Sequence, residues 1–182
     1  MTENAGTPGA ANPAAKGIAA ITEYLTAHGV AYEVVEHEES MSAAAEARAT
    51  NRQLKQVAKT VVLRDATADV LAILPASERL DLRKARDVLG ATRHLRLATE
   101  AEMAADFPMI EVGATPPIGP MTPKVEVVDP RLLEEARVLC PGGDHRHSIL
   151  LDPREIVRVT SAEVADICED SPPASTAWFG RP

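Results

Sequence analysis

Three stretches of this sequence carry residues that could do chemistry: a lysine in a strand, a glycine and proline loop, and a histidine-bearing turn. Lys59 lies within 57–64, where a period of two puts it on the same face as Val61 and Leu63. A lysine there either reaches solvent from the strand's end or lines a cavity. In a cavity, its ammonium would be a desolvated charge with three donors, suited to a carbonyl, hydroxyl or phosphate oxygen.

The second stretch, Gly113 to Pro120, is too stiff and too rich in turn residues for an ordinary connector. Its prolines fix φ and lack an N–H, whereas its glycines allow backbone geometry and close approach that a side chain would forbid. One interpretation is a rigid surface turn between two strands. The other is a wall that presents backbone N–H groups to a ligand.

The third stretch is a turn at Gly142 and Gly143, flanked by Cys140, His145 and His147. These three side chains could be metal ligands, but their spacing matches no standard zinc pattern. A nucleophile pair of Cys140 and His147 is a second hypothesis, which requires the two to meet in space. The sequence contains no P-loop and no strand-linked Gly-x-Gly-x-x-Gly. We predict no metal and no cofactor.

Hydrophobic periodicity and capping residues predict the elements that position these stretches. We expect helices at 17–28, 42–50, 82–89, 99–106, 129–135 and 160–168, with one helical turn at 152–156. We expect strands at 30–37, 57–64, 70–74, 94–98, 124–129, 136–139, 148–151 and 157–159, with 57–64 and 70–74 forming a hairpin. If the helix at 42–50 continued through 51–56, it would place Arg48, Arg52 and Lys55 on one face.

The composition predicts one domain between two tails. A chain of 182 residues with 45% apolar residues can bury one core. Residues 1–16 are expected to be a disordered leader, 17–170 the domain, and 171–182 a C-terminal tail. Aromatic residues make up only 3%, which argues against a platform for stacking bases.

The charge and cysteine content restrict partners and location. The net charge of −8 argues against broad adhesion to nucleic acid or membranes. Arg79, Arg83 and Arg86 nevertheless recur at helical spacing, and they form either a solvated face with nearby acids or a patch for a phosphate backbone. With no apolar h-region at the N-terminus, no membrane span and two distant cysteines, a cytoplasmic protein with reduced thiols is expected.

The three stretches, in this order, resemble the YbaK/prolyl-tRNA-synthetase-associated domain family. The matching segments are 57–63, 113–119 and 142–148, and the resemblance covers about residues 17–170. It implies an α+β fold, a single domain with a curved, mostly antiparallel mixed sheet surrounded by helices. It also implies a free-standing editing hydrolase that cleaves the ester of mischarged aminoacyl-tRNA.

The resemblance also assigns roles to residues. It implies that Lys59 contacts the ester or ribose oxygens, or orients the water, and that Gly113 and Ala114 offer N–H groups. Substrate-binding positions are implied at Thr115, Pro116, Pro117, Ile118, Gly119, Gly143 and His147, the last matching better than His145 because it directly precedes a strand. The implied partners are the acceptor end of aminoacyl-tRNA and, beyond it, an aminoacyl-tRNA synthetase, with Arg79, Arg83 and Arg86 as tRNA contacts.

Several functional alternatives stay open at this point. The pocket could hold aminoacyl-tRNA or a small ligand without catalysis, or hydrolyse a different small molecule, and the basic stretch could bind an acidic partner protein. Alanine, serine, threonine and cysteine are all small enough to be the amino acid removed. Discrimination by a single methylene is worth only about 1–3 kcal/mol in a pocket, so the sequence does not choose among them.

Overall fold

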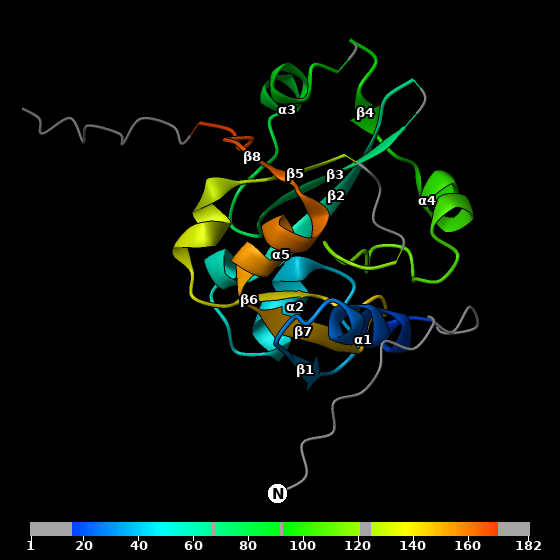
Figure 1. Ribbon diagram of the computed structural model, residues 1–182, viewed down its shortest axis with the longest axis vertical. Coiled ribbons are helices and arrows are strands. Elements are labelled where there is room, and N and C mark those ends of the chain that lie inside the picture. Colours follow the sequence, from blue (N-terminus) through cyan, green and yellow to red (C-terminus); the bar gives the residue numbers. More distant parts are fainter. Residues whose placement is uncertain (1–15, 67, 92, 121–124, 171–182) are drawn as a thin grey trace, which may run out of the picture.

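A five-stranded mixed sheet is the larger of two sheets in the computed structural model, which describes residues 16–66, 68–91, 93–120 and 125–170 (Figure 1). At its centre is the predicted hairpin, in which β2 and β3 pair antiparallel from Ala58 opposite Pro75 to Arg64 opposite Asp69. The strand order is β4-β2-β3-β5-β8, and both β3–β5 and β5–β8 pair in parallel. The strands are β2 (Ala58–Arg64), β3 (Asp69–Pro75), β4 (Arg96–Leu97), β5 (Glu126–Val128) and β8 (Glu163–Val164).

A smaller, wholly antiparallel sheet has the order β1-β7-β6. Its strands are β1 (Tyr32–Glu36), β7 (His147–Leu151) and β6 (Val138–Pro141). A parallel bridge between Val57, just before β2, and Leu139 on β6 connects the two sheets. The predicted α+β class with mostly antiparallel pairing is therefore confirmed, although the expected sheet is divided into two sections.

Helices cover these sheets, and most of them begin at a capping residue. The Ser42 and Asp81 side chains cap α2 and α3, and Thr99 and Glu102 form the predicted capping box of α4. Gly90 ends α3 in the left-handed conformation, as expected for a glycine stop. The helices are α1 (Ile18–Ala27), α2 (Ala43–Ala49), α3 (Leu82–Leu89), α4 (Glu100–Asp106) and α5 (Pro153–Thr160), with 3₁₀ turns η1 (Leu54–Gln56) and η2 (Pro130–Glu134).

Two predicted elements near the C-terminus are wrong. The single turn expected at 152–156 is the start of α5, which continues through the expected strand at 157–159 and ends at Thr160. The helix expected at 160–168 is absent, because Ser161 takes the left-handed conformation and the chain enters β8. The apolar residues around Ile156 fit the pattern of a helix face as well as that of a strand. A run this short therefore does not distinguish a helix from a strand.

The helix expected at 42–50 does not continue through 51–56, so the shared face considered for Arg48, Arg52 and Lys55 is not formed. Asn51 has φ 51° and α2 stops before it, so that the next residues form only the short turn η1. The predicted leader and tail, 1–16 and 171–182, lie outside the described residues except for Lys16. None of the helices in the described part of the chain is both long enough and apolar enough to cross a membrane.

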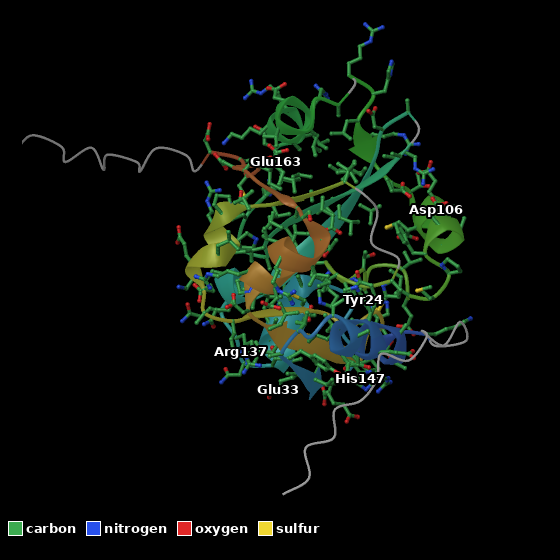
Figure 2. All side chains as sticks on the ribbon, viewed as in Figure 1. Tyr24, Glu33, Asp106, Arg137, His147 and Glu163 are labelled. Carbon is green, nitrogen blue, oxygen red and sulfur yellow. The ribbon has the colours of Figure 1, made fainter. Side chains whose placement is uncertain are left out.

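Both faces of β2 are covered, and this fact decides which of its side chains reach the site. Ala58 and Val62 belong to the main core, to which α1 and α5 also contribute, whereas Leu63 belongs to a second core cluster with Ala85 of α3. Tyr24 on α1 packs against the main core (Figure 2). Val61 packs beside Leu63, so the predicted alternation along the strand is confirmed. Thr60 then belongs to the face of Ala58, and Lys59 to the face of Leu63.

Candidate active site

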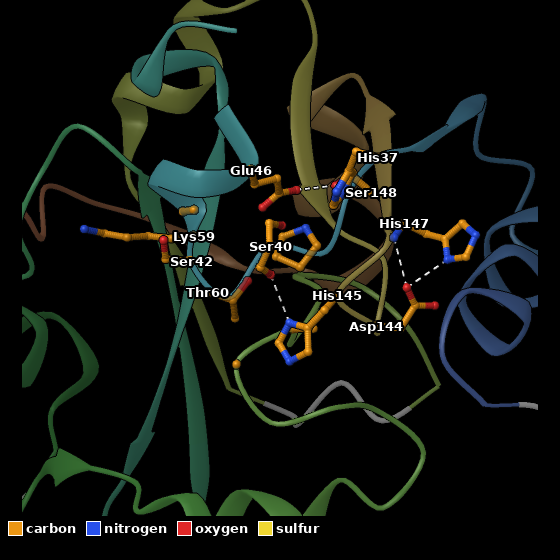
Figure 3. Close-up of a pocket in the computed structure, with 14 residues that line it drawn as sticks. His37, Ser40, Ser42, Glu46, Lys59, Thr60, Asp144, His145, His147 and Ser148 are labelled. Atoms are coloured by element: carbon orange, nitrogen blue, oxygen red, sulfur yellow. Dashed lines mark hydrogen bonds and ion pairs between the residues drawn. The ribbon is translucent and has the colours of Figure 1, made fainter. Parts of the chain in front are cut away.

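A polar cleft lies where β2 approaches the smaller sheet (Figure 3). Its free volume is about 60 Å³. A space that holds one water measures about 10–15 Å³ on the same scale, so the cleft accepts a group of a few heavy atoms. Its polar side chains come from β2, α2, the loop before α2, the turn that precedes β7 and the first two residues of β7: His37, Ser40, Ser42, Glu46, Lys59, Thr60, Asp144, His145, His147 and Ser148.

Thr60 contributes a hydroxyl to the floor of this cleft. Its Oγ1 is buried, and no described residue forms a hydrogen bond with it. An unpartnered buried hydroxyl costs about 1–3 kcal/mol, and a ligand oxygen in the cleft would supply the missing partner. Thr60 is a candidate that the sequence analysis did not select, although the period of two along β2 was sufficient to place it.

Lys59 forms part of the cleft wall, but its ammonium points away from the cleft (Figure 3). The ammonium donates a hydrogen bond to the Glu78 carbonyl, beyond the end of β3. Burial is the main reason that the pKa of Lys59 is lowered. The expectation that this ammonium faces substrate is therefore not met in this conformation, because the face it shares with Leu63 is the one turned away from the cleft.

Only Gly113 and Ala114 of the predicted loop line the cleft. Gly113 has φ +91°, a conformation that favours glycine, and its N–H has no acceptor among the described residues. The Ala114 N–H donates to the Glu111 carbonyl at 3.0 Å, so the prediction that it offers an oxyanion contact needs that bond to break. The structure thus supports one of the two expected backbone donors.

The rest of the loop supports the wall from behind. Residues 114–119 are buried, and Ile118 is 1% exposed within the main core. None of the five predicted contacts in this segment lines the cleft: Thr115, Pro116, Pro117, Ile118 and Gly119. The loop is not a surface turn, and most of it does not line the cleft, because its residues 114–119 are buried.

Asp144 shapes the turn before β7. Its Oδ1 accepts hydrogen bonds from the backbone N–H groups of Arg146 and His147, both at 2.9 Å, and lies 2.8 Å from His147 Nδ1. Its Oδ2 accepts from the Ile18 N–H at 3.3 Å, which connects the turn to α1. Hydrogen bonds to its charged form lower the pKa of Asp144 despite its partial burial.

Gly143 supports this turn from outside the cleft. Its φ is +93°, and a Cβ at this position would lie 3.1 Å from the Gly17 backbone carbonyl carbon. Gly143 does not line this cleft and packs closely against Gly17 at the start of α1, so its substrate contact stays a prediction.

Both histidines of the turn line the cleft, but they point differently (Figure 3). The His145 ring lies below Ser40 and Thr60, and its Nδ1 is 3.1 Å from the Ser40 carbonyl oxygen. Because a carbonyl only accepts, Nδ1 donates this bond. The His147 ring turns toward Asp144, so His145 is more central than the sequence comparison of the two histidines suggested.

A buried chain of three polar side chains was not predicted. Ser148 donates to Glu46 Oε1, and the Ser148 Oγ also lies 2.7 Å from His37 Nε2. Burial raises the pKa of Glu46, while the Ser148 hydrogen bond and the His37 charge act in the opposite direction. Single residues of these types, more than a hundred positions apart in the case of Glu46 and Ser148, give no local signal in a sequence.

The cysteine hypotheses lose their geometric basis. Cys140 is 1% exposed in the main core, and burial raises the pKa of its thiol, so it is not presented as a nucleophile beside His147. Among the described residues, one group has potential ligand atoms close enough together to hold a metal ion: Asp129, Asp166 and Cys168. Arg131 bonds both of its carboxylates, at 3.0 and 2.8 Å, so cationic side chains already neutralise this group.

The predicted basic stretch is only partly available to a partner. The Arg83 side chain is 77% exposed and 3.8 Å from Asp81, and Arg79 is also exposed. Arg86 is half-buried, with an Nε that has no partner among the described residues. The α3 helix that carries Arg83 and Arg86 lies at the opposite end of the molecule from α1 and β7 (Figure 1).

Comparison with protein families gives one match. The model described as an aminoacyl-tRNA editing domain matches residues 37–159, which include Lys59, Thr60, the glycine and proline loop and the histidine turn. A comparison with curated proteins gives no match.

Several solved structures are similar to the chain. A proposed trans-editing enzyme for prolyl tRNA synthetase is 31% identical, with a TM-score of 0.68, and the match covers 76% of this chain and 87% of the other. A scaffold protein from computational epitope grafting is 27% identical, with a TM-score of 0.75 and coverages of 85% and 97%. The hypothetical protein APE2540 is also 27% identical, with a TM-score of 0.72 and coverages of 80% and 96%.

Proposed function

Since the chain belongs to the aminoacyl-tRNA editing domain family, we propose that it is a free-standing deacylase. Its reaction is hydrolysis of the ester between a small amino acid and the terminal adenosine of a mischarged tRNA. The catalytic unit is residues 17–170. Its partners are the acceptor end of aminoacyl-tRNA and, where editing is coupled to charging, an aminoacyl-tRNA synthetase.

The observation that carries this proposal is the set of donors that converge on the cleft without a side-chain nucleophile. The Thr60 hydroxyl and the Gly113 N–H have no acceptor among the described residues, and His145 lines the same cleft beside Gly113. An aminoacyl ester is already activated, so a site needs to position water and stabilise the developing oxyanion. Donors that are fixed before the substrate binds are suited to this task.

The size of the cleft supports a small amino acid. About 60 Å³ accommodates the side chain and amino group of a small amino acid such as alanine, serine, threonine or cysteine. The choice among the four depends on fractions of an ångström in the wall formed by Gly113 and Ala114.

Other predicted residues take supporting roles in this proposal. Thr115 to Gly119 hold Gly113 and Ala114 in place, because their burial fixes the loop against the core. Asp144 holds His147 at the rim, where it can meet the ribose end of the substrate. Arg79, Arg83 and Arg86 are proposed to contact the tRNA backbone away from the reacting ester.

Lys59 enters the proposal differently from Thr60. To reach a substrate oxygen, its ammonium has to leave the Glu78 carbonyl, whereas Thr60 already lines the cleft and its hydroxyl has no partner among the described residues. A direct catalytic role for Lys59 therefore includes a change of rotamer when substrate binds.

A panel of mischarged tRNAs tests the proposal, with the wild type, Thr60→Val and Lys59→Ala assayed together. We expect deacylation of at least one small aminoacyl-tRNA. Loss of a preorganised donor typically costs 10²–10³ in rate, so Thr60→Val should lose roughly a hundredfold. Thr60→Ser keeps the hydroxyl and is the matched control. Full activity of Thr60→Val would remove Thr60 from the mechanism, and full activity of Lys59→Ala would do the same for Lys59.

The same panel tests the second candidate function, a non-catalytic module that holds aminoacyl-tRNA. The orientation of the Lys59 ammonium and the occupied Ala114 N–H favour this candidate, since both remove groups expected to assist catalysis. Tight binding of aminoacyl-tRNA with no turnover of any substrate in the panel would establish it.

A further inference from the structure

Glu46 is the buried carboxyl group of the cleft. Its residue is 5% exposed, and it lies on the inner face of α2. Oε1 accepts from Ser148, and no described residue bonds Oε2. A buried carboxylate is costly unless hydrogen bonds or an opposite charge compensate it. The charge that acts on Glu46 is that of His37, which reaches it only through Ser148.

The hydrogen bonds among Glu46, Ser148 and His37 allow two arrangements, which differ in whether Glu46 or His37 Nε2 carries a proton. His37 Nδ1 lies 2.7 Å from the Glu38 carbonyl oxygen, which can only accept, so Nδ1 carries a proton. In the neutral state, Glu46 donates its proton to Ser148, and Ser148 donates to His37 Nε2. In the charged state, Nε2 carries the proton and donates to Ser148, and Ser148 donates to the Glu46 carboxylate. Moving between the states shifts two protons, that of Glu46 to Ser148 Oγ and that of Ser148 to His37 Nε2, and the net result is the transfer of one proton from Glu46 to His37.

We propose that Glu46 binds the α-ammonium group of the aminoacyl ester, with Ser148 and His37 as the positioning residues that take up its proton. This inference rests on the proposed deacylase function. In the structure Ser148 donates to Oε1, so Oε2 is left to accept a hydrogen bond from an ammonium group in the cleft. The substrate class is thereby narrowed to esters of amino acids whose α-amino group is free.

The neighbouring carboxylate is less suited to this role. Both oxygens of Asp144 are taken by the backbone N–H groups of Ile18, Arg146 and His147 and by the His147 ring. Glu111 is exposed, and its Oε2 accepts from the His145 N–H at 2.9 Å. Glu46 is the acid whose second oxygen is uncommitted and faces the small interior of the cleft (Figure 3).

The test compares the best aminoacyl-tRNA of the panel with its N-acetylated form. Truncating one partner of a buried charge pair typically changes affinity by about 30-fold to about 5,000-fold, so we expect the wild type to prefer the free amine by at least about 30-fold in kcat/KM. Glu46→Gln should abolish this preference by slowing the free amine alone. Ser148→Ala and His37→Ala should raise KM for the free amine and leave KM for the N-acetylated substrate unchanged.

Wild-type enzyme that hydrolyses both substrates equally, or a folded Glu46→Gln enzyme that keeps the preference, would overturn the inference. A binding experiment separates it from the proposed function and from misfolding. By NMR titration, L-alaninamide should bind the wild type more tightly than neutral N-acetyl-L-alaninamide, and Glu46→Asp should weaken this discrimination without removing the charge. If this preference is seen but no aminoacyl-tRNA is hydrolysed, the deacylase function fails while the ammonium site stands. Equal binding of the two amides would refute the ammonium site.

Discussion

Glu126 provides a prediction in which both the sign and the size follow from the structure. It lies on β5 facing the main core and is 4% exposed, and neither carboxyl oxygen has a hydrogen-bond partner among the described residues. The nearby Thr160 hydroxyl donates to the Ile156 carbonyl at 2.9 Å. Burial raises the pKa of Glu126 from 4.5 to about 8, and the proximity of Thr160 offsets this only slightly.

The carboxyl of Glu126 therefore holds its proton more tightly in the folded chain than in the unfolded chain. The contribution of Glu126 to the unfolding free energy is fully present below about pH 4.5, the pKa expected of an unfolded glutamate. This contribution falls as the pH rises toward and through about 8. Each pH unit between these values costs about 1.4 kcal/mol. The total is roughly 5 kcal/mol, of which roughly 3 kcal/mol is already lost at pH 7.

Glu126→Gln removes this titration while keeping the shape of the side chain. Urea unfolding from pH 5 to pH 9 should show a steep loss of unfolding free energy in the wild type and a much flatter profile in the variant, so that the variant is the more stable at pH 9. Glu163→Gln, on the exposed neighbouring strand β8, is the matched control and should follow the wild type. Parallel profiles for wild type and Glu126→Gln would refute the reasoning. If deacylation by the wild type also falls as the pH rises, the variant separates loss of fold from loss of chemistry.

The remaining predictions concern the loop, the basic helix and the core. Gly113→Val should lower deacylation strongly, because φ +91° strains any other residue by about 1–3 kcal/mol and tilts the free N–H; Thr115→Ser is the control and should lose little. Arg83→Glu should weaken aminoacyl-tRNA binding at low salt and reduce the salt dependence of the affinity, whereas the control Arg154→Glu should do neither. If the wild type and Arg83→Glu show the same salt dependence in a filter-binding assay, α3 does not contact the tRNA. Ile118→Ala should lower the unfolding free energy by about 2–5 kcal/mol in a urea titration, and a smaller loss would contradict its place in the core.

The sequence was sufficient for the parts of the fold where local chemistry is decisive. The caps at Thr99 and Asp152, the glycine stop at Gly90 and the hairpin at 57–74 were all predicted from short patterns. The segment 157–168 was not, because its few apolar residues fit a strand and a helix equally well. Only packing against the main core, which is a tertiary effect, selects the helix there.

The site was predicted in position but not in detail. Periodicity correctly separated Lys59 from Thr60 on β2, but it gives no sign of which covered face borders a cavity. The hydrogen-bonded residues Glu46, Ser148 and His37 come from α2, β7 and the residue after β1, so their contact becomes visible only when these segments are assembled. Single residues of common types carry no signal until the fold brings them together.

The contact between Gly17 and Gly143 has an evolutionary consequence. The α1 helix lies outside the segment 37–159 that matches the editing domain, yet its first backbone groups pack on Gly143 and bond Asp144. A substitution at Gly17 or a new N-terminal fusion would change the position of the histidine turn without altering any residue of the cleft. Divergence of substrate preference among such proteins can therefore begin in a segment that a comparison of cleft residues would never inspect.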